Sequence, residues 1–552
     1  YNVAIGKGAL ASQNGDYDNY NTAVGAEAGN SVTTATANTL IGGVAGDALT
    51  TGGSNVAIGY TALGADTKGF NSIAIGQNSL ATQNFTTNTD TYNVAIGSLA
   101  GRYITTGDAN TLIGGLTGDA LTVGASNVAV GKNALGADTK GNKSIAIGQG
   151  TLFNQNFTTS TDSYNTAVGH EAGLNVTTGT SNTLIGGLAG DGLTTGSSNV
   201  AVGVNALATD DLGSKCVAVG QGALYSQNYA TATDGYNVAV GHEALVTHST
   251  GTSNTALGGL ALYSLTSSAN NVAIGRSAMY ATTTGESNVA IGRDAFVTNQ
   301  NGDRTVAIGA YSLGLSNPTG TAHSMENTAV GYQTGYYMTT ATNNTLVGTN
   351  AGLSISTGSS NTAVGNEAMI GTSSNKTTGS YNTACGYRAG FVIQAGGANN
   401  SFFGDRAGYS NTTAQENTAV GSQALYNNVD GGRCTAVGGQ SFYTHDPSTA
   451  ANTYNVGIGY YSGRNCTTGT KNVCLGAFAG STLSTGDNNV LVGQDAGGYI
   501  TTGSSNVMMG REAGYGASGS ELTGNNNVGL GDGALYRIIT TAHENTAVGN
   551  AA

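Results

Sequence analysis

Charged side chains are scarce in this chain. They make up 9% of its 552 residues, and the formal net charge is −13. A nucleic-acid-binding domain normally carries a basic face, which this composition does not supply. No apolar run is long enough to cross a membrane as a helix, and no stretch has the form of a signal peptide. We therefore expect no nucleic-acid partner and no direct membrane insertion of this segment.

Proline and cysteine are also rare. The chain has two prolines, and no proline-rich linker or run of charge marks a domain boundary. Its five cysteines are odd in number and irregularly spaced, so they form no disulfide framework, although a bridge between Cys466 and Cys474 remains an alternative to free thiols. No Ser-His-Asp or Cys-His set and no calcium-binding Gly-Gly-x-Gly-x-Asp repeat is present. We predict no catalytic residue, no cofactor and no metal site, so the protein is not expected to be an enzyme; a carbohydrate-cleaving β-helix is the enzymatic alternative.

What the sequence does contain is a repeat. Thirty-one copies of Asn-Val/Thr-Ala/Leu-Val/Ile-Gly run from residues 2–6 to residues 545–549, most of them seventeen residues apart. Three intervals of seventeen and one of twenty-one give a super-repeat of 72 residues, seen at Gly76, Gly148 and Gly220. So short a unit cannot fold alone and must stack on its neighbours. We predict a single continuous all-β solenoid of about 31 turns over residues 1–552. Because the chain opens and closes within a repeat, we expect it to be a fragment of a longer protein.

Each position of the repeat has its own rule. The residue four before the motif glycine is Asn in twenty-six of the thirty-one copies, which favours a ladder of stacked amides. The third residue after the glycine is always small, and the fourth is either Gly or a large apolar residue, as expected for a narrow interior. A second glycine ten residues after the first predicts two short strands per turn.

The three residues before each motif glycine are apolar or small on both faces of the predicted strand. One face can fill the interior of the coil, but the other has no cover within the same chain. Identical copies packed about an axis are the economical solution, so the pattern predicts a homo-oligomer.

Two copies of the motif carry a family resemblance. Asn71-Ser72-Ile73-Ala74-Ile75-Gly76 and residues 143–148 are similar to the head repeats of trimeric autotransporter adhesins of the YadA type, although the family's turns are shorter. The resemblance implies a left-handed parallel β-roll, built as an intertwined or side-by-side homotrimer. It also implies a rigid extracellular adhesin head that attaches to a surface or host receptor. The longer turns resemble repeat-rich fibre proteins of phages and microbes, so a phage or virus tail fibre with the same roll is the alternative. The expected location is a cell surface or a virion appendage.

The twenty-one-residue turns are the candidate contact points. Their extra residues form polar loops that carry aromatic side chains, which can stack on sugar rings or form rigid contact area. We therefore expect binding of a surface receptor or glycan through these aromatics, or else their packing against the coil or between chains. The candidate binding residues are Phe85, Tyr92, Phe157, Tyr164, Tyr229 and Tyr236.

Other polar residues recur without a clear site. His170-Glu171 and His242-Glu243 lie one super-repeat apart, too far for a shared metal, and we expect them on the surface; the alternative is that three copies of one histidine meet at a trimer axis. The other four histidines are assigned to no common column. Asp66, Asp138 and Asp210 form one column, several turns apart, so they make no acid pair of the glycosidase type. Threonine pairs such as 50–51 and 105–106 leave an ice-binding face as a further alternative.

Overall fold

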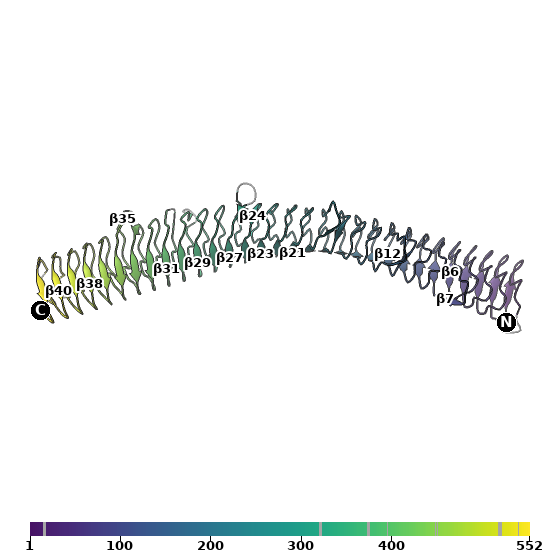
Figure 1. Cartoon of the computed structure of the whole chain (residues 1–552), viewed down its shortest axis with the longest axis horizontal. Coiled ribbons are helices and arrows are strands. Elements are labelled where there is room, and N and C mark those ends of the chain that lie inside the picture. The colour runs from purple at the N-terminus through teal and green to yellow at the C-terminus, as the bar shows by residue number, and fades with distance from the viewer. Residues whose placement is uncertain are drawn as a thin grey trace. The chain divides into compact units, whose positions relative to one another are not determined.

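The computed structural model describes residues 1–14, 18–318, 323–372, 376–394, 396–447, 449, 451–516, 521–538 and 540–552. These ranges contain strands and turns but no helix, and every strand pairing within the units is parallel. Contacts divide the chain into two units, Tyr1–Asn271 with fifteen turns and Val272–Ala552 with sixteen. Figure 1 shows the labelled strands following one another, turn by turn, in each unit. The chain is therefore an all-β parallel solenoid of 31 turns, as the repeat predicts.

Each turn of the first unit contributes one three-residue strand to a parallel sheet, in register with the next turn. For example, Val128 pairs with Ile145, and Ala129 pairs with Ala146. The strands are β1 (Val3–Ile5), β2 (Thr22–Val24), β3 (Thr39–Ile41), β4 (Val56–Ile58), β6 (Ile73–Ile75), β8 (Val94–Ile96), β9 (Thr111–Ile113), β10 (Val128–Val130), β12 (Ile145–Ile147), β14 (Thr166–Val168), β15 (Thr183–Ile185), β16 (Val200–Val202), β18 (Val217–Val219), β20 (Val238–Val240) and β21 (Thr255–Leu257).

The second unit is built in the same way. Its strands are β22 (Val272–Ile274), β23 (Val289–Ile291), β25 (Val306–Ile308), β27 (Thr328–Val330), β28 (Thr345–Val347), β29 (Thr362–Val364), β30 (Thr383–Cys385), β31 (Ser401–Phe403), β32 (Thr418–Val420), β34 (Thr435–Val437), β36 (Val456–Ile458), β37 (Val473–Leu475), β38 (Val490–Val492), β39 (Val507–Met509), β40 (Val528–Leu530) and β41 (Thr546–Val548).

A second strand forms at only five places in the described residues, so the expectation of two strands in every turn is too general. Elsewhere the second glycine closes a turn without a ladder; at these five places an inserted loop brings two residues back beside the preceding turn. The pairs are β5 (Gly69–Phe70) with β7 (Thr89–Asp90), β11 (Gly141–Asn142) with β13 (Thr161–Asp162), β17 (Gly213–Ser214) with β19 (Thr233–Asp234), β24 (Gly302–Asp303) with β26 (His323–Ser324), and β33 (Gly431–Gly432) with β35 (Ala451–Asn452).

The middle residue of each strand points into the coil, and its two neighbours point outward. In β9, Leu112 is fully buried, whereas Ile113 keeps 38% of its surface exposed. The same alternation runs from β2 to β40. The strand therefore has one dry face and one half-exposed apolar face.

Glycine and leucine alternate inside the coil because they share one volume. A Cβ atom added at Gly101 or Gly118 would lie 2.9 or 3.0 Å from a methyl group of Leu112, which lies between them. At Ala129, where neither this strand nor the next one, with Ala146, offers a large residue, the fourth residue after the glycine is large instead: Leu135 is fully buried. Because a glycine and a neighbouring large side chain fill the same space, the fourth residue after the motif glycine is either Gly or large. This confirms the narrow interior.

The recurring asparagines form the predicted ladder. The side-chain oxygen of Asn110 accepts the backbone N–H of Asn127 at 3.0 Å, and the amide nitrogen of Asn127 donates to the carbonyl of Gly141 at 2.9 Å. Both side chains are fully buried. Each amide thus satisfies backbone groups that would otherwise be stranded in the interior.

The motif glycine is required by backbone geometry. Gly131 has a φ of +131°, and a Cβ atom there would lie 2.5 Å from the carbonyl oxygen of Gly148 in the next turn. No residue with a side chain fits such a corner without moving the stack. The same geometry recurs turn after turn, which is why the motif always ends in glycine.

Candidate functional site

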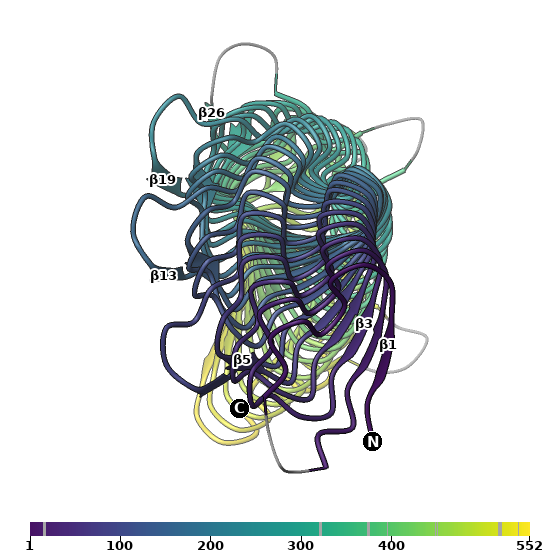
Figure 2. The same ribbon diagram turned by 90° about the vertical axis from the view of Figure 1, so that its right-hand side faces the viewer.

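The five places with a second strand pair are the most distinctive surface features, and we refer to them as the long-turn corners. Three belong to the first unit (β5–β7, β11–β13 and β17–β19) and two to the second (β24–β26 and β33–β35). In end view, the corners of the first unit, labelled at β5, β13 and β19, lie on one flank, away from the flank that carries β1 and β3 (Figure 2). The long turns of the first unit therefore project on the side away from its stacked three-residue strands.

An inner network of polar side chains supports each corner. At β11–β13, the amide nitrogen of Gln155 donates to Asp138 Oδ2 at 2.7 Å and to Ser144 Oγ at 2.8 Å. The Gln155 oxygen accepts from Asn165 Nδ2 at 2.9 Å. Ser144 stands where most turns have the ladder asparagine, so Gln155 replaces the missing amide. Gln83 and Gln227 do the same at the other corners of the first unit.

The carboxylates in this network are buried without a cationic partner. Burial raises the pKa of Asp138 above its usual range, while hydrogen bonds from Gln155 and the backbone of Gly141 partly offset that effect. Asp66 and Asp210 have the same surroundings and the same direction of pKa shift. These three side chains have no exposed surface. They therefore cap the inserted loop from within and are not accessible to a substrate.

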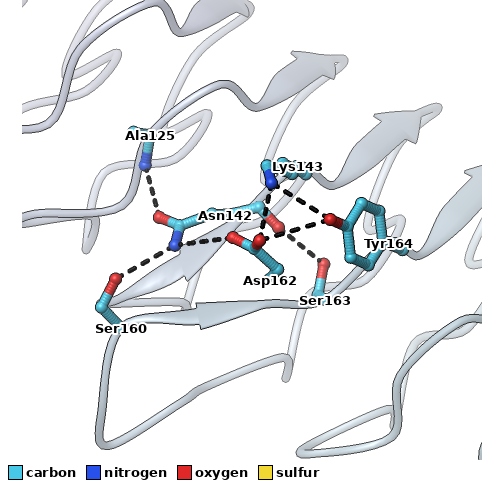
Figure 3. Close-up of polar contacts among 7 residues, drawn as sticks. All are labelled: Ala125, Asn142, Lys143, Ser160, Asp162, Ser163 and Tyr164. Carbon is cyan, nitrogen blue, oxygen red and sulfur yellow. Dashed lines mark hydrogen bonds and ion pairs between the residues drawn. The ribbon is translucent and has the colours of Figure 1, made fainter.

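An outer cluster sits on the solvent side of the same corner (Figure 3). Lys143 Nζ lies 2.6 Å from Asp162 Oδ2 and 3.1 Å from the hydroxyl oxygen of Tyr164, and 5.0 Å from the centre of the Tyr164 ring. The hydrogen bond that Lys143 donates to Asp162 raises the pKa of Lys143 and lowers the pKa of Asp162. Lys215, Asp234 and Tyr236 repeat the arrangement one super-repeat later. The cluster holds a tyrosine ring in a fixed pose with a cation beside it.

Asn142 fills the space between this cluster and the preceding turn. Its side-chain oxygen accepts the backbone N–H of Ala125 at 2.9 Å, and its amide nitrogen donates to Ser160 Oγ at 3.0 Å and to Asp162 Oδ1 at 3.3 Å (Figure 3). The corner at β11–β13 is thus closed by its own side chains.

Three of the six aromatics predicted to bind face the coil. Phe85, Phe157 and Tyr229 keep only 8%, 5% and 3% of their surface exposed. The hydroxyl of Tyr229 donates to the carbonyl of Gly251 at 2.6 Å, and burial raises the pKa of this phenol. Each follows an inward-facing glutamine by two residues, and this alternation could have identified them from the sequence. These rings pack against the coil, which was the alternative reading.

The other three candidates face solvent. Tyr92, Tyr164 and Tyr236 expose 60%, 56% and 53% of their surface. Each directly precedes a ladder asparagine and has a φ of +49°. Residues at this position point outward throughout the array, as Ser126 and Lys143 also do. The long-turn corners of the first unit thus present one exposed tyrosine each.

The histidines separate into surface and interior positions. His170 and His242 lie on the surface, 3.7 and 3.9 Å from Glu171 and Glu243. His248 and His445, assigned to no common column from the sequence, in fact share one: each lies seven residues after its motif glycine and is fully buried. This shared column was missed because His323 and His543, with which these two were grouped, lie at other positions of the turn.

The described residues contain no metal cluster. No group of three His, Cys, Asp or Glu side chains in these ranges is arranged to hold an ion. All five cysteines are free, Cys466 and Cys474 included, and four of them are buried. The first threonine of each pair is also occupied: the hydroxyl of Thr50 donates to the carbonyl of Thr67, and that of Thr105 to Thr122.

One aromatic feature was missed from the sequence. Phe391, Tyr409, Tyr426 and Tyr443 stack face to face in successive turns, with ring centres 4.7 to 5.0 Å apart. Arg388 and Arg464 lie over the two outer rings. Each ring is five residues after a motif glycine, so the column could have been found by alignment of the repeats. Each ring face in the stack is covered by the next ring or by an arginine. The stack therefore offers no open face on which a ligand could stack.

Neither family models nor curated protein sequences give a relative for this chain. None of the described segments forms a helix that could cross a bilayer.

Proposed function

We propose that the chain is a non-enzymatic structural fibre whose copies assemble side by side as a left-handed homotrimer and which serves attachment outside the cell. The observation that carries the proposal is the outward face of the three-residue strands. None of the 31 strands has a charged residue, and the outward position before the motif glycine is aliphatic in every turn of the first unit. We refer to these outward third strand residues, directly before the motif glycine, as the aliphatic stripe.

The aliphatic stripe is half-exposed along its whole course. Ile113, Ile147 and Ile185 keep 38%, 38% and 39% of their surface exposed, and Leu257 keeps 45%. Soluble single chains rarely expose a contiguous apolar surface of this length. Covering the stripe is therefore favourable by the hydrophobic effect.

A second copy of the chain is the partner that fits. The stripe repeats once per turn, over fifteen turns that span roughly 70 Å at the usual strand spacing in the first unit. A partner that follows it over that length needs the same repeat, which this chain supplies. In the first unit the long-turn corners lie on the flank away from these strands (Figure 2), so association through the stripe leaves the exposed tyrosines accessible.

The mass of the chain in solution tests the assembly. We expect analytical ultracentrifugation to give three times the chain mass of 54.7 kDa. Replacing Ile113, Ile147 and Ile185 by Glu should dissociate the assembly, whereas Tyr164→Ser should leave it intact. A wild-type chain that sediments as a folded monomer at micromolar concentration would reject the proposal.

The attachment role is tested at the long-turn corners. Beads coated with the chain should adhere to mucin-coated glass, and the combined change of Tyr92, Tyr164 and Tyr236 to Ser should reduce the number of bound beads. Tyr60→Ser is the matched control, because Tyr60 is 61% exposed but lies in a short turn. Equal losses for the control and the triple variant would count against the corners as contact points.

A further inference from the structure

The long-turn corner at β33–β35 carries an open groove. The groove has a volume of about 280 Å³ and lies beside the two short strands. Its polar and charged lining comes from three successive turns. The residues that matter here are Gln415, Glu416, Asp430, Gly432, Arg433 and Asn452.

The groove exists because of one glycine. In the equivalent position of three other corners, a side-chain oxygen accepts the backbone N–H of the preceding turn: Asn142 from Ala125 at 2.9 Å, Ser214 from Ser197 at 3.0 Å, and Asp303 from Glu286 at 2.8 Å. In the fourth corner, the ring of Phe70 lies against Gly53. Gly432 supplies no side chain, so the space that Asn142 closes in Figure 3 stays open.

This vacancy leaves hydrogen-bonding groups available. Among the described residues, neither the backbone N–H of Gln415 nor the side-chain amide of Asn452 has a hydrogen-bond partner. Asp430 accepts one hydrogen bond, from the hydroxyl of Thr413, through Oδ1 only. The groove therefore offers donors and acceptors at once, within the reach of a single small ligand.

The charge and size of the groove limit the class of ligand that it can bind. Arg433 is paired with Glu416 at 3.0 Å, and its guanidinium also donates to Tyr454 at 2.6 Å, so it is not a free cation. Asp430 then leaves the groove with an excess of negative charge, which disfavours carboxylated or sulfated ligands. The volume lies just below the range of about 300–1,000 Å³ that suits drug-sized molecules, so one ring is the appropriate size. In a polyhydroxylated ring, each hydroxyl can both donate a hydrogen bond to the groove and accept one from it.

We infer that the groove at Gly432 binds one neutral pyranose unit of a glycan. The backbone N–H of Gln415 and the amide of Asn452 donate to ring hydroxyls, and the carboxylate of Asp430 accepts from them. This inference rests on the proposed attachment function and gives it a ligand class and a site. It does not depend on the oligomeric state, so the mass measurement and the binding measurement fail independently.

Ligand-observed saturation-transfer NMR on the full chain tests the inference. The probes are the methyl glycosides of glucose, galactose, mannose and N-acetylglucosamine, with methyl glucuronide as the charged comparison. We expect at least one neutral glycoside to receive saturation, and the glucuronide to receive less. If no neutral glycoside gives a signal, or if the glucuronide gives the stronger one, the inference is overturned.

Two substitutions locate the binding. Gly432→Asn restores the side chain found at Asn142 and should reduce the affinity at least tenfold. A Cβ atom at Gly432 would lie 3.1 Å from Asn452 Oδ1 and from the Gln415 carbonyl oxygen, so the second variant, Asp430→Ala, removes an acceptor without adding atoms. Asn142→Gly, at the closed corner, is the matched control and should not weaken binding. A signal that survives both groove substitutions would place the glycoside elsewhere and overturn the assignment.

Discussion

The side-chain oxygen of Asn38 accepts the backbone N–H of Asn55, one turn further along the chain, at a distance of 3.0 Å. The amide nitrogen of Asn38 donates to the carbonyl of Gly52 at 3.1 Å. Both asparagines are fully buried, so no water can replace these bonds. The ladder thus supplies, inside the coil, the backbone pairing that a three-residue strand is too short to provide.

Asn38→Ala should destabilise the first unit locally. It leaves the Asn55 N–H and the Gly52 carbonyl buried and unpaired, at a cost of about 1–3 kcal/mol for each group. Because turns of a solenoid contact only their neighbours, hydrogen exchange should accelerate mainly between residues 21 and 72. The control is Asn84→Ala, since Asn84 is exposed. Similar exchange rates in the two variants would show that the ladder does not stabilise the stack.

Leu112 and Ile113 are adjacent, but alanine substitutions of the two should have different effects on stability and assembly. Leu112→Ala empties the space between Gly101 and Gly118 and should cost about 2–5 kcal/mol, so the unfolding midpoint falls at every protein concentration. Ile113→Ala trims an outward residue and should instead raise the concentration needed for assembly. Denaturant titrations at two concentrations separate the two effects. A loss of stability in Ile113→Ala that is as large as in Leu112→Ala, and independent of concentration, would contradict the assignment of faces.

The repeat was sufficient to predict the solenoid, because each column has one physical task. Ala129 and Leu135 illustrate this, because the pairing of a small residue in the strand with a large residue after the glycine is visible in the sequence. The orientation of the loop aromatics was not predictable in the same way: Phe157 and Tyr164 lie in one loop, yet only Tyr164 is exposed. Their difference depends on where the inserted residues restore the register, which periodicity alone does not define. The groove at Gly432 depends on the absence of a side chain, and this becomes informative only when the corners are compared in space.

The buried carboxylates should make the first unit more stable in mild acid. Burial raises the folded-state pKa of Asp66, Asp138 and Asp210 above the unfolded value of 3.8. Between these values the folded state holds protons that the unfolded chain has lost. Their contribution to stability is therefore complete below 3.8 and is lost as the pH rises through the folded pKa.

Changing all three aspartates to Asn should remove this dependence. The amide fits the column, because Asn428 occupies it in the second unit and accepts the N–H of Gly431 at 3.1 Å. Thermal unfolding of wild type and variant at about pH 4 and about pH 7 measures the difference. Asp162→Asn is the contrasting control: the pKa of Asp162 is lowered by Lys143, so its contribution is present above 3.8 and is lost as the pH falls. An unchanged pH profile in the triple variant would refute the assignment.

His445 should have the opposite effect in the second unit. Burial lowers its pKa from 6.5 to about 4, so the folded state resists a proton that the unfolded chain accepts. Its stabilising contribution is complete above 6.5 and is lost as the pH falls towards about 4, by about 3 kcal/mol in total. His445→Leu should abolish that loss, and Asn455 keeps its bond to the Gly469 carbonyl. Hydrogen exchange of residues 438–476 between these pH values is the local readout, with the surface change His170→Gln as control. If wild type and His445→Leu lose protection equally on acidification, the buried imidazole does not titrate as inferred.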